Sequence, residues 1–504
     1  MKTVLCATYE GLDAKVVNVE STLTKGLPSF SVVGMVSASI NEAKERVKSA
    51  LLSSDFKFPP KRITINLAPS DISKSGSQFD LSMALLIAFD GDKESLDGWF
   101  VFGEMGLDGS VKENFQLYPL ILSLANQGVI QKAIVPYEAL EKLSKIPNVE
   151  FYGVKTLQEA LEMLNNQQNI TPSVSKTDID ASFYEIDGDR YFYVKEYDED
   201  FIDVKGQEVA KRASLISAVG FHNIIFEGSP GCGKSMISKR LRYILPPMRE
   251  DEILEVAKLQ TLDFKEPDFK PKRPYRAPHN SSTQASIFGG GSRRAMIGEV
   301  GLSHLGILMF DELPHFGKNI LEALREPLED AKIRISRVNS KIEYPADFLF
   351  VGAMNPCPCG NLLDQSKECR CTDVEIQRYK NRLSDPFLDR IDINVVMQKV
   401  DAQDKPSLSS KQMHKKVVEA HIFSKKREQK VFNAKLCDAD VDRFCIMDDE
   451  AKDVLDMAID RFALSFRSIK KVQKVARSIA DLDSSDFIQK AHILEALSYR
   501  RREI

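Results

Sequence analysis

The alternation of apolar and polar positions predicts a chain that mixes strands and helices before it becomes entirely helical. Short runs rich in β-branched and apolar residues at 29–34 and 62–67 are typical of strands. Helical spacing of apolar residues indicates an amphipathic helix over 40–52 and a largely buried helix over 80–88. The pattern therefore predicts an N-terminal α+β domain over residues 1–165.

A polar stretch separates this first domain from the rest of the chain. Residues 165–175 are rich in Asn, Gln and Ser and lack periodicity, which predicts a linker over 166–199. Apolar runs at 222–226, 306–310 and 348–354 are typical of buried parallel strands and predict an α/β domain over 200–395. Long helical patterns predict a helical domain over 396–504.

Composition narrows the class of protein. A length of 504 residues exceeds what one hydrophobic core organises, and contents of 43% hydrophobic and 28% charged residues are ordinary for a globular protein. No apolar run approaches the length of a membrane span, and the apolar part of the N-terminus is too short for a signal peptide. We therefore expect a cytoplasmic protein without a membrane partner. The net charge of −4 excludes a globally basic nucleic-acid binder but allows a locally basic surface.

Residues 228–235, Gly-Ser-Pro-Gly-Cys-Gly-Lys-Ser, match the pattern G-x-x-x-x-G-K-S between the strand at 222–226 and a helix predicted over 236–245. Lys234 would reach the β- and γ-phosphates of a nucleotide, and Ser235 would ligate Mg²⁺. A glycine-rich turn without a ligand is the alternative, which the flanking strand and helix disfavour. The sequence predicts binding of ATP or GTP. Because backbone N–H groups of such a loop surround phosphate oxygens, the candidate binding residues are Gly228, Ser229, Pro230, Gly231, Cys232, Gly233, Lys234 and Ser235.

Two further strands end in polar residues that suit the same site. Asp311 and Glu312 follow the run at 306–310, and a nucleotide site needs one carboxylate for Mg²⁺ and another to orient the attacking water. We assign the first role to Asp311 and the second to Glu312; a strand that ends in a solvated acidic turn is the alternative. Asn355 follows the run at 348–354 and can hold both water and the γ-phosphate, although Asn-Pro alone also makes a turn.

Together these motifs resemble AAA+ ATPases and, more narrowly, the magnesium-chelatase-like ComM/YifB family. The similarity extends over nearly the whole chain and implies a hexameric ring with ATP sites between subunits. Arg390 then resembles the arginine finger that reaches a neighbour's γ-phosphate, and Arg467 resembles the second sensor arginine on the helical lid. Cys232 replaces a common Ser of the loop, and Asn280 stands where relatives usually carry a second histidine. The stretches that carry the resemblance, besides the phosphate loop, are 273–279, 289–291, 298–306, 383–392 and 477–482.

Four cysteines lie close together directly after Asn355, as two C-x-C pairs separated by nine residues. Four soft thiolates suit tetrahedral Zn²⁺ with no open position, so we expect a structural zinc site. Four reduced thiols without a metal and an iron–sulfur cluster are the alternatives. A metal here would brace the loop between the Asn355 strand and the Arg390 segment. The candidate ligands are Cys357, Cys359, Cys369 and Cys371.

Basic residues recur in three segments near the strands of the nucleotide domain. Each segment alone is typical of a solvated face, but copies of a basic hairpin around a ring would form a positive channel that follows phosphates. We therefore predict a motor on single-stranded, forked or branched DNA. The resemblance implies branch migration in transformation or recombination, with recombination proteins as candidate partners. The candidate DNA contacts are Arg273 and Arg276, then Arg293 and Arg294, then Lys332, Arg334, Arg337 and Lys341 in a predicted hairpin over 331–342.

The N-terminal domain resembles the Lon-protease-like fold found at the start of this family, through residues 66–80. A Lon-type peptidase needs a Ser nucleophile and a Lys about forty residues later, whereas these positions fall on Gln78 and Tyr118. Ser77 with Lys112 is the remaining pair, and we predict an inactive domain that serves assembly or DNA contact. Two rival functions stay open. A magnesium-chelatase-like subunit that remodels a protein partner is disfavoured by the long N-terminal domain and the cysteines, and an ATP-dependent Lon-like peptidase by the missing dyad.

Overall fold

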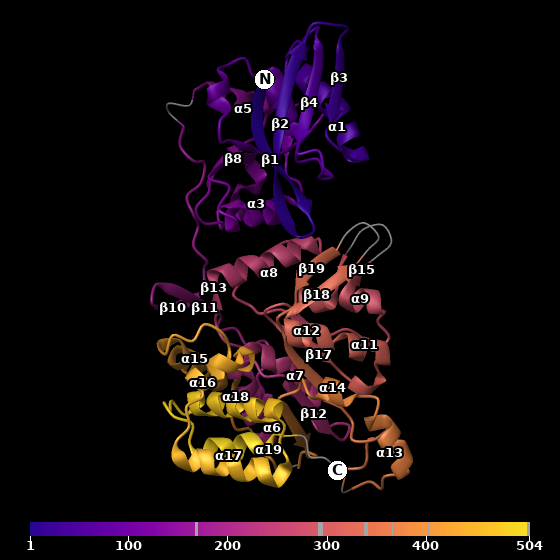
Figure 1. Ribbon diagram of the computed structural model, residues 1–504, viewed down its shortest axis with the longest axis vertical. Coiled ribbons are helices and arrows are strands. Elements are labelled where there is room, and N and C mark those ends of the chain that lie inside the picture. Colours follow the sequence, from indigo (N-terminus) through magenta and orange to yellow (C-terminus); the bar gives the residue numbers. More distant parts are fainter. Residues whose placement is uncertain (167–169, 291–295, 337–340, 365, 402, 501–504) are drawn as a thin grey trace. The chain divides into compact units, whose positions relative to one another are not determined.

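The computed structural model describes residues 1–166, 170–290, 296–336, 341–364, 366–401 and 403–500. The chain forms two compact units, whose strands and helices are labelled in Figure 1. The first unit is Met1–Asp180 with Ala257–Phe269 and Ser336–Glu343, and the second is Ala181–Val256, Lys270–Ile335 and Tyr344–Ile504. Both mix helices and strands, as predicted from the sequence.

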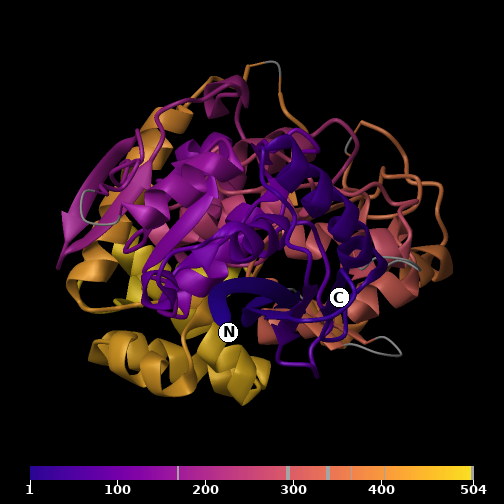
Figure 2. The ribbon, with the colours of Figure 1, turned by 90° about the horizontal axis from the view of Figure 1, so that it is seen from above.

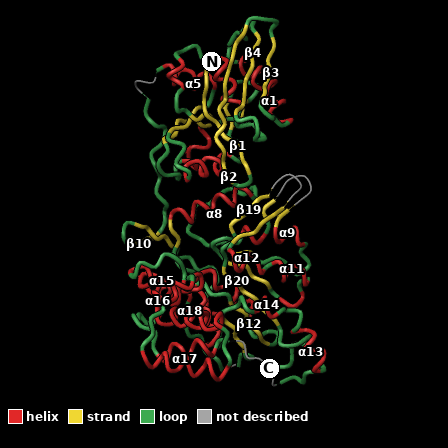
Figure 3. Tube along the Cα trace, in the orientation of Figure 1, coloured by secondary structure: helices red, strands yellow, loops and turns green. Residues whose placement is uncertain are grey.

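The first unit is built on a seven-stranded mixed sheet in the order β3-β4-β2-β1-β5-β8-β9. Figure 3 shows its strands in yellow, with β1, β2, β3 and β4 labelled. Its centre pairs antiparallel, and its two ends pair parallel. The predicted strands and helices at 29–34, 62–67, 40–52 and 80–88 are all present. The strands are β1 (Lys2–Glu10), β2 (Asp13–Thr24), β3 (Ser29–Val33), β4 (Arg62–Ala68), β5 (Phe100–Val101), β8 (Lys132–Pro136) and β9 (Glu150–Val154), with a separate ladder of β6 (Glu104–Met105) and β7 (Val111–Lys112). The helices are α1 (Ala38–Ser53), α2 (Asp80–Ala88), α3 (Leu117–Asn126), α4 (Leu140–Leu143) and α5 (Leu157–Asn165).

The second unit contains a five-stranded parallel sheet in the order β14-β17-β20-β12-β21. Every residue of β17 and β20 is buried, which explains why these strands are continuous apolar runs in the sequence. The helix predicted over 236–245 is an α-helix only as far as Arg240 and continues as a 3₁₀ turn over Leu241–Ile244, after which Pro246 and Pro247 prevent any further helix. The strands are β12 (Ile224–Gly228), β14 (Tyr275–Arg276), β17 (Ile307–Phe310), β20 (Leu349–Met354) and β21 (Ile393–Met397), with helices α6 (Glu208–Gly220) and α7 (Lys234–Arg240). Helix α8 (Glu250–Leu262) begins in this unit, and its residues from Ala257 onward belong to the first unit.

Shorter elements connect these strands. The pairs β15 (Gly289–Gly290) with β16 (Met296–Ile297) and β18 (Lys332–Ser336) with β19 (Lys341–Pro345) each form a two-stranded sheet. The intervening helices are α9 (Gln284–Phe288), α10 (Glu299–Leu302), α11 (Lys318–Ala323), α12 (Arg325–Asp330), α13 (Asp373–Lys380) and α14 (Asp385–Leu388).

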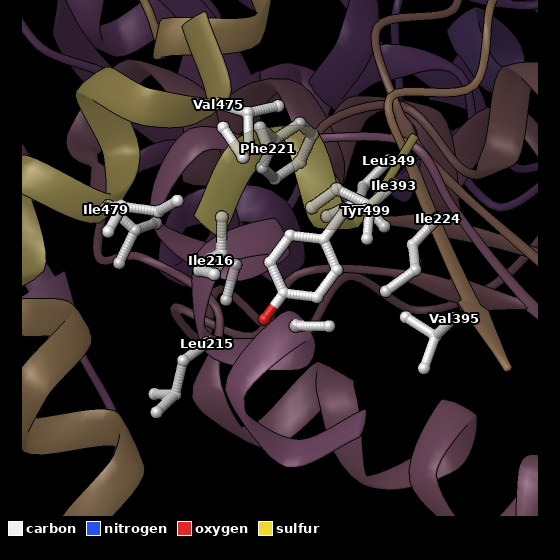
Figure 4. Close-up of a cluster of buried hydrophobic side chains, with 14 of the residues drawn as sticks. Leu215, Ile216, Phe221, Ile224, Leu349, Ile393, Val395, Val475, Ile479 and Tyr499 are labelled. Carbon is white, nitrogen blue, oxygen red and sulfur yellow. The ribbon is translucent and has the colours of Figure 1, made fainter. Parts of the chain in front are cut away.

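The C-terminal part is helical, as predicted, and its helices gather in one group in both views (Figures 1 and 2). Side chains of this group and of the sheet share one core, where Val475, Ile479 and Tyr499 meet Phe221 and Ile393 (Figure 4). The helices are α15 (Ser410–Lys426), α16 (Asp438–Phe444), α17 (Asp449–Phe462), α18 (Phe466–Leu482) and α19 (Lys490–Ser498).

The stretch 477–482 in α18 stabilises this group of helices and connects it to the sheet. Arg477 and Asp481 are fully buried and pair at 3.1 Å, and Arg427 donates to the same carboxylate at 2.6 Å. The Ser478 hydroxyl lies 2.7 Å from a ring nitrogen of buried His222, just before β12. Charges buried this deeply persist only when they are paired, so the role of this stretch is structural.

The segment predicted as a linker is partly folded. Strands β10 (Ser182–Ile186) and β11 (Asp189–Tyr193) form an antiparallel hairpin that extends onto β13 (Met248–Arg249). Tyr184 hydrogen-bonds His421 of α15 through its hydroxyl, and Tyr197 bonds His414 at 3.0 Å. Aromatic residues favour strands and Asp-Gly at 187–188 favours a two-residue turn, so the linker prediction was wrong for this part.

None of the helices in the described ranges combines the length and the apolar character that crossing a membrane requires.

Candidate nucleotide site and its surroundings

The phosphate loop, residues 228–235, leaves the end of β12 between the neighbouring strands β20 and β21. Gly231 and Gly233 have φ angles of 82° and 96°, in the left-handed region that favours glycine. Gly228 has no room for a side chain, because a Cβ atom there would lie 2.7 Å from both the Cys232 sulfur and the Met397 carbonyl oxygen. The glycines therefore provide the tight backbone path that phosphate binding needs.

The structure brings the ends of three strands together at this loop. The Lys234 ammonium donates to the carbonyl oxygens of Gly228 and Ser229 at 2.6 and 3.1 Å and to the Asn355 side-chain oxygen at 3.1 Å. The Ser235 hydroxyl donates to an Asp311 carboxylate oxygen at 2.9 Å. An ammonium beside backbone N–H groups suits phosphates, and a hydroxyl beside a carboxylate suits Mg²⁺. The residues present thus fit a nucleotide with its magnesium ion.

Glu312 is held in an unusual conformation next to this pair. Its φ angle is 52°, its backbone N–H donates to Asp311 at 2.9 Å, and its carboxylate accepts a hydrogen bond of 3.0 Å from the Asn280 amide. A left-handed conformation at a non-glycine residue costs about 1 kcal/mol and is often found at functional sites. Asn280 therefore positions the carboxylate proposed to orient water. The sequence marked Asn280 only as a departure from the family pattern and gave no sign of this contact.

The Glu329 carboxylate binds both Arg390, the predicted arginine finger, and Arg467, the predicted second sensor arginine. Arg390 pairs with Glu329 of α12, and Arg467 lies 3.3 Å from the other oxygen of the same carboxylate. Burial raises the pKa of Glu329, but Arg390 and then Arg467 outweigh it, so the pKa lies below its ordinary value. The Arg390 side chain is only 10% exposed, and its Nε has no hydrogen-bond partner. Nothing in the sequence singled out Glu329.

The four cysteines form a compact cluster of the size that one metal ion requires. The Cys357 and Cys359 sulfur atoms are 3.4 Å apart, and Cys369 lies 3.7 and 3.6 Å from them. A tetrahedron with zinc–sulfur bonds of 2.3 Å has edges of about 3.8 Å, whereas an iron–sulfur cluster places several atoms between its thiolates. Backbone N–H groups of Asn361 and Arg370 lower the pKa of Cys359 to about 6, which favours the thiolate at this sulfur, whereas the pKa values of Cys369 and Cys371 lie above the ordinary value. All four sulfur atoms lie within 4.8 Å of one another, and the set is Cys357, Cys359, Cys369 and Cys371.

Comparisons with known proteins agree with this arrangement. Residues 200–405 match the family model of magnesium chelatase, subunit ChlI; residues 19–139 match that of subunit ChlI of Mg-chelatase; and residues 407–500 match that of the ChlI C-terminal region. Competence protein ComM of Haemophilus influenzae is 36% identical over 97% of this chain and 95% of its own length. The chain belongs to the magnesium-chelatase-like ComM/YifB family of AAA+ ATPases.

Two further relatives show how far this similarity reaches. YifB of Escherichia coli, which is described as uncharacterized, is 34% identical over 97% of this chain and 95% of its own length. The magnesium-chelatase 67 kDa subunit of Heliobacterium mobile is 22% identical over only 30% of this chain and 27% of its own length. Membership of an AAA+ ATPase family implies ATP and Mg²⁺ as ligands of the site described above.

The basic residues predicted to contact DNA have different environments. Lys332 and Arg334 are exposed on β18, and Ile333 between them is buried, so the strand presents a basic face. Arg276 donates to both carboxylate oxygens of Glu299, at 2.5 and 2.7 Å. Lys341 begins β19. Arg293, Arg294 and Arg337 lie outside the described residues.

The prediction of a DNA contact at Arg273 was wrong, because this side chain is buried. Its guanidinium donates to the carbonyl oxygens of Pro246, Pro247 and Leu305 at 2.8 to 2.9 Å. It also lies 5.5 Å from the ring centres of Phe221 and Phe432, which stack on each other. In the sequence, a basic segment with one tyrosine suggested an exposed surface that binds DNA. In the structure, the Arg273 guanidinium instead donates hydrogen bonds to carbonyl oxygens inside the second unit.

Arg273→Ala is expected to lower the free energy of unfolding by about 3 kcal/mol, because two buried carbonyl oxygens and one partly buried carbonyl oxygen lose their donor. Arg276→Ala, which removes a half-buried ion pair, is the matched control and should cost about 1 kcal/mol or less. Denaturant unfolding monitored by circular dichroism measures both. Equal losses for the two variants would contradict the structural role of Arg273.

The residues at the Lon-like positions of the first unit are unsuited to peptidase chemistry. Gln78 is buried and its amide donates to the carbonyl oxygens of Ala7 and Ser75, and Tyr118 is buried in α3. Ser77 bonds the Glu104 carboxylate and accepts from Asn114 at 2.8 Å. A carboxylate and an amide do not replace the lysine that activates serine in Lon-type sites. The inactivity of this unit and its Lon-like fold stay predictions.

Proposed function

We propose that this protein is a ring-forming, ATP-dependent DNA motor that promotes branch migration in natural transformation or recombination. The observation that carries the proposal is the convergence of Lys234, Ser235, Asp311 and Asn355 at one edge of the parallel sheet. This arrangement can hold ATP and Mg²⁺ and orient water at the γ-phosphate. A relative that spans nearly the whole chain is named a competence protein, which supports a role on DNA.

The positions of Arg390 and Arg467 support the proposal that the protein forms a ring. Hydrolysis by such a site needs a positive group at the γ-phosphate besides the loop lysine. Arg390 and Arg467 are held by Glu329, and none of the partners shown for them within the described ranges belongs to the phosphate loop. In a homo-hexamer, the same surface of one subunit would meet the phosphate loop of its neighbour, as in heterologous interfaces that close into rings. Each ATP site would then need two subunits.

The DNA contact is proposed from the basic face of β18. Lys332 and Arg334 project from one face of this strand, which pairs with β19 in a two-stranded sheet. Copies of this hairpin around the ring would line a channel with positive charge, which binds the phosphate backbone without reading bases. The proposed substrate is therefore single-stranded, forked or branched DNA of any sequence, and recombination proteins are proposed partners.

A magnesium-chelatase-like role in remodelling a protein partner is the second candidate. The chelatase subunit found as a relative covers 30% of this chain, whereas the competence protein covers 97%. This difference in coverage favours the DNA motor. The Lon-like peptidase has less support, because Ser77 contacts Glu104 and Asn114.

The motor proposal predicts that single-stranded or forked DNA raises the rate of ATP hydrolysis several-fold. In the double variant Lys332→Ala/Arg334→Ala, the stimulation of ATP hydrolysis by DNA should fall. A plot of the logarithm of the affinity for single-stranded DNA against the logarithm of the salt concentration should also become shallower, by about 0.7 for each phosphate contact that is lost. The exposed pair on α17, Lys452→Ala/Arg461→Ala, is the control for lost positive charge. A coupled ATPase assay and fluorescence anisotropy at several salt concentrations measure these effects. If neither single-stranded nor forked DNA changes the rate of ATP hydrolysis, the DNA-motor proposal is wrong.

A further inference from the structure

The cysteine loop, residues 357–371, packs directly on the phosphate loop. Gly360 has a φ angle of 79°, and its backbone N–H donates to the Cys357 carbonyl at 3.0 Å in a tight turn. A Cβ atom at Gly360 would lie 2.6 and 2.7 Å from two ring carbons of Pro230 in the phosphate loop. The backbone of one loop therefore touches a side chain of the other, with no space for a methyl group between them.

Both ends of the cysteine loop are also tied to the nucleotide site. At its start, Asn355 stands two residues before Cys357 and accepts the hydrogen bond from Lys234. At its end, Thr372 caps α13, and Lys380 in the last turn of that helix lies 3.7 Å from Glu227, next to the phosphate loop. The cysteine loop itself therefore meets the phosphate loop at Pro230, and the segments on either side of it contact Lys234 and Glu227.

The cysteine loop has little apolar burial of its own to keep it in this position. Leu362 and Leu363 are 39% and 41% exposed, and three of the four cysteines are only partly buried. A segment without a core is ordered chiefly by cross-links, and four thiolates around one ion provide such a link. Three of the sulfur atoms lie 3.4 to 3.7 Å apart and all four lie within 4.8 Å of one another, so one metal ion could supply the rigidity that the apolar contacts do not.

We propose that Zn²⁺ bound by the four cysteines holds Gly360 against Pro230 and thereby sets the affinity of the phosphate loop for nucleotide. The metal ion then acts at a distance on ATP binding, as a support of the loop and not as part of the reaction. The proposal rests on the ATP site proposed above, but it does not depend on DNA as the substrate.

The experiment compares three full-length variants by zinc content, thermal unfolding and the Kd for a fluorescent ATP analogue without DNA. Cys359→Ser should lose zinc and raise the Kd at least about tenfold, because a misplaced loop loses its phosphate contacts. Gly360→Ala keeps all four ligands and should retain one zinc per chain, yet raise the Kd by a similar factor. Leu362→Ala, in the same loop but exposed, should change neither quantity.

If the Cys359→Ser protein does not fold, the Gly360→Ala protein tests whether the contact between Gly360 and Pro230 sets the affinity for nucleotide. A Gly360→Ala protein that holds its zinc and binds nucleotide with unchanged Kd would overturn the proposal, as would wild-type protein purified without zinc that binds nucleotide normally and takes up no added Zn²⁺. Restoration of the Kd when Zn²⁺ is added back to chelated wild-type protein would support it. The motor proposal fails by a different measurement, the absence of DNA stimulation, so the two failures are distinguishable.

Discussion

Arg390→Ala is expected to lower kcat for ATP hydrolysis about a thousandfold and to leave the Kd for ATP within about twofold. The proposed ring places this guanidinium at the γ-phosphate of a neighbouring subunit, where charge develops only during the reaction. Its own chain holds it through Glu329 at a surface that also carries Arg467. Arg461→Ala, which removes an exposed arginine of α17, is the control and should retain the wild-type rate.

Mixing two inactive variants tests whether the site is shared. Lys234→Ala removes the lysine that holds the phosphates but keeps Arg390, whereas Arg390→Ala keeps the phosphate loop. In a mixed ring at equal amounts, about a quarter of the interfaces would join an intact loop to an intact arginine. The mixture should therefore hydrolyse ATP far faster than either variant alone. A mixture as inactive as its components, or an Arg390→Ala protein with the wild-type rate, would contradict the shared site.

The parallel sheet and the residues at its edge could be predicted from the sequence for a physical reason. Strands buried on both faces are unbroken apolar runs, so β17 and β20 stood out, as did the polar residues that end them. Neighbouring parallel strands end at the same edge of a sheet, which places Asp311 and Asn355 beside the phosphate loop without any knowledge of distant contacts. The cysteine cluster was visible because its ligands lie close together along the chain.

Contacts between residues far apart in the chain could not be predicted. Arg273 and Lys332 are both basic residues with apolar and polar neighbours in the sequence. Only the folded chain shows that Arg273 donates to carbonyl oxygens inside the second unit whereas Lys332 is exposed. Glu329 stands in a charged helix like many surface residues, yet it pairs with arginines 61 and 138 positions away. A single sequence carries no pattern for such pairs, because their partners are chosen by the fold.

Glu312→Gln is expected to lower kcat by about a thousandfold while ATP remains bound. The substitution keeps the size of the side chain, and an amide can still accept the hydrogen bond from Asn280, so the geometry at 3.0 Å is preserved. What is lost is the negative charge that draws a proton from the attacking water. Glu326→Gln, an exposed carboxylate of α12, is the matched control for the loss of one charge.

The contrast with Lys234→Ala identifies the step that fails. Lys234 bonds the phosphate loop and Asn355, so its removal should raise the Kd for ATP at least about a hundredfold, whereas Glu312→Gln should bind ATP as the wild type does. Equilibrium binding of a fluorescent ATP analogue and single-turnover hydrolysis separate the two effects. The backbone at Glu312 is held in a strained conformation beside Asp311, so the carboxylate is positioned before ATP binds. The loss of kcat in Glu312→Gln should therefore come from the missing negative charge and not from a displaced side chain. Normal turnover by Glu312→Gln would mean that another group activates the water.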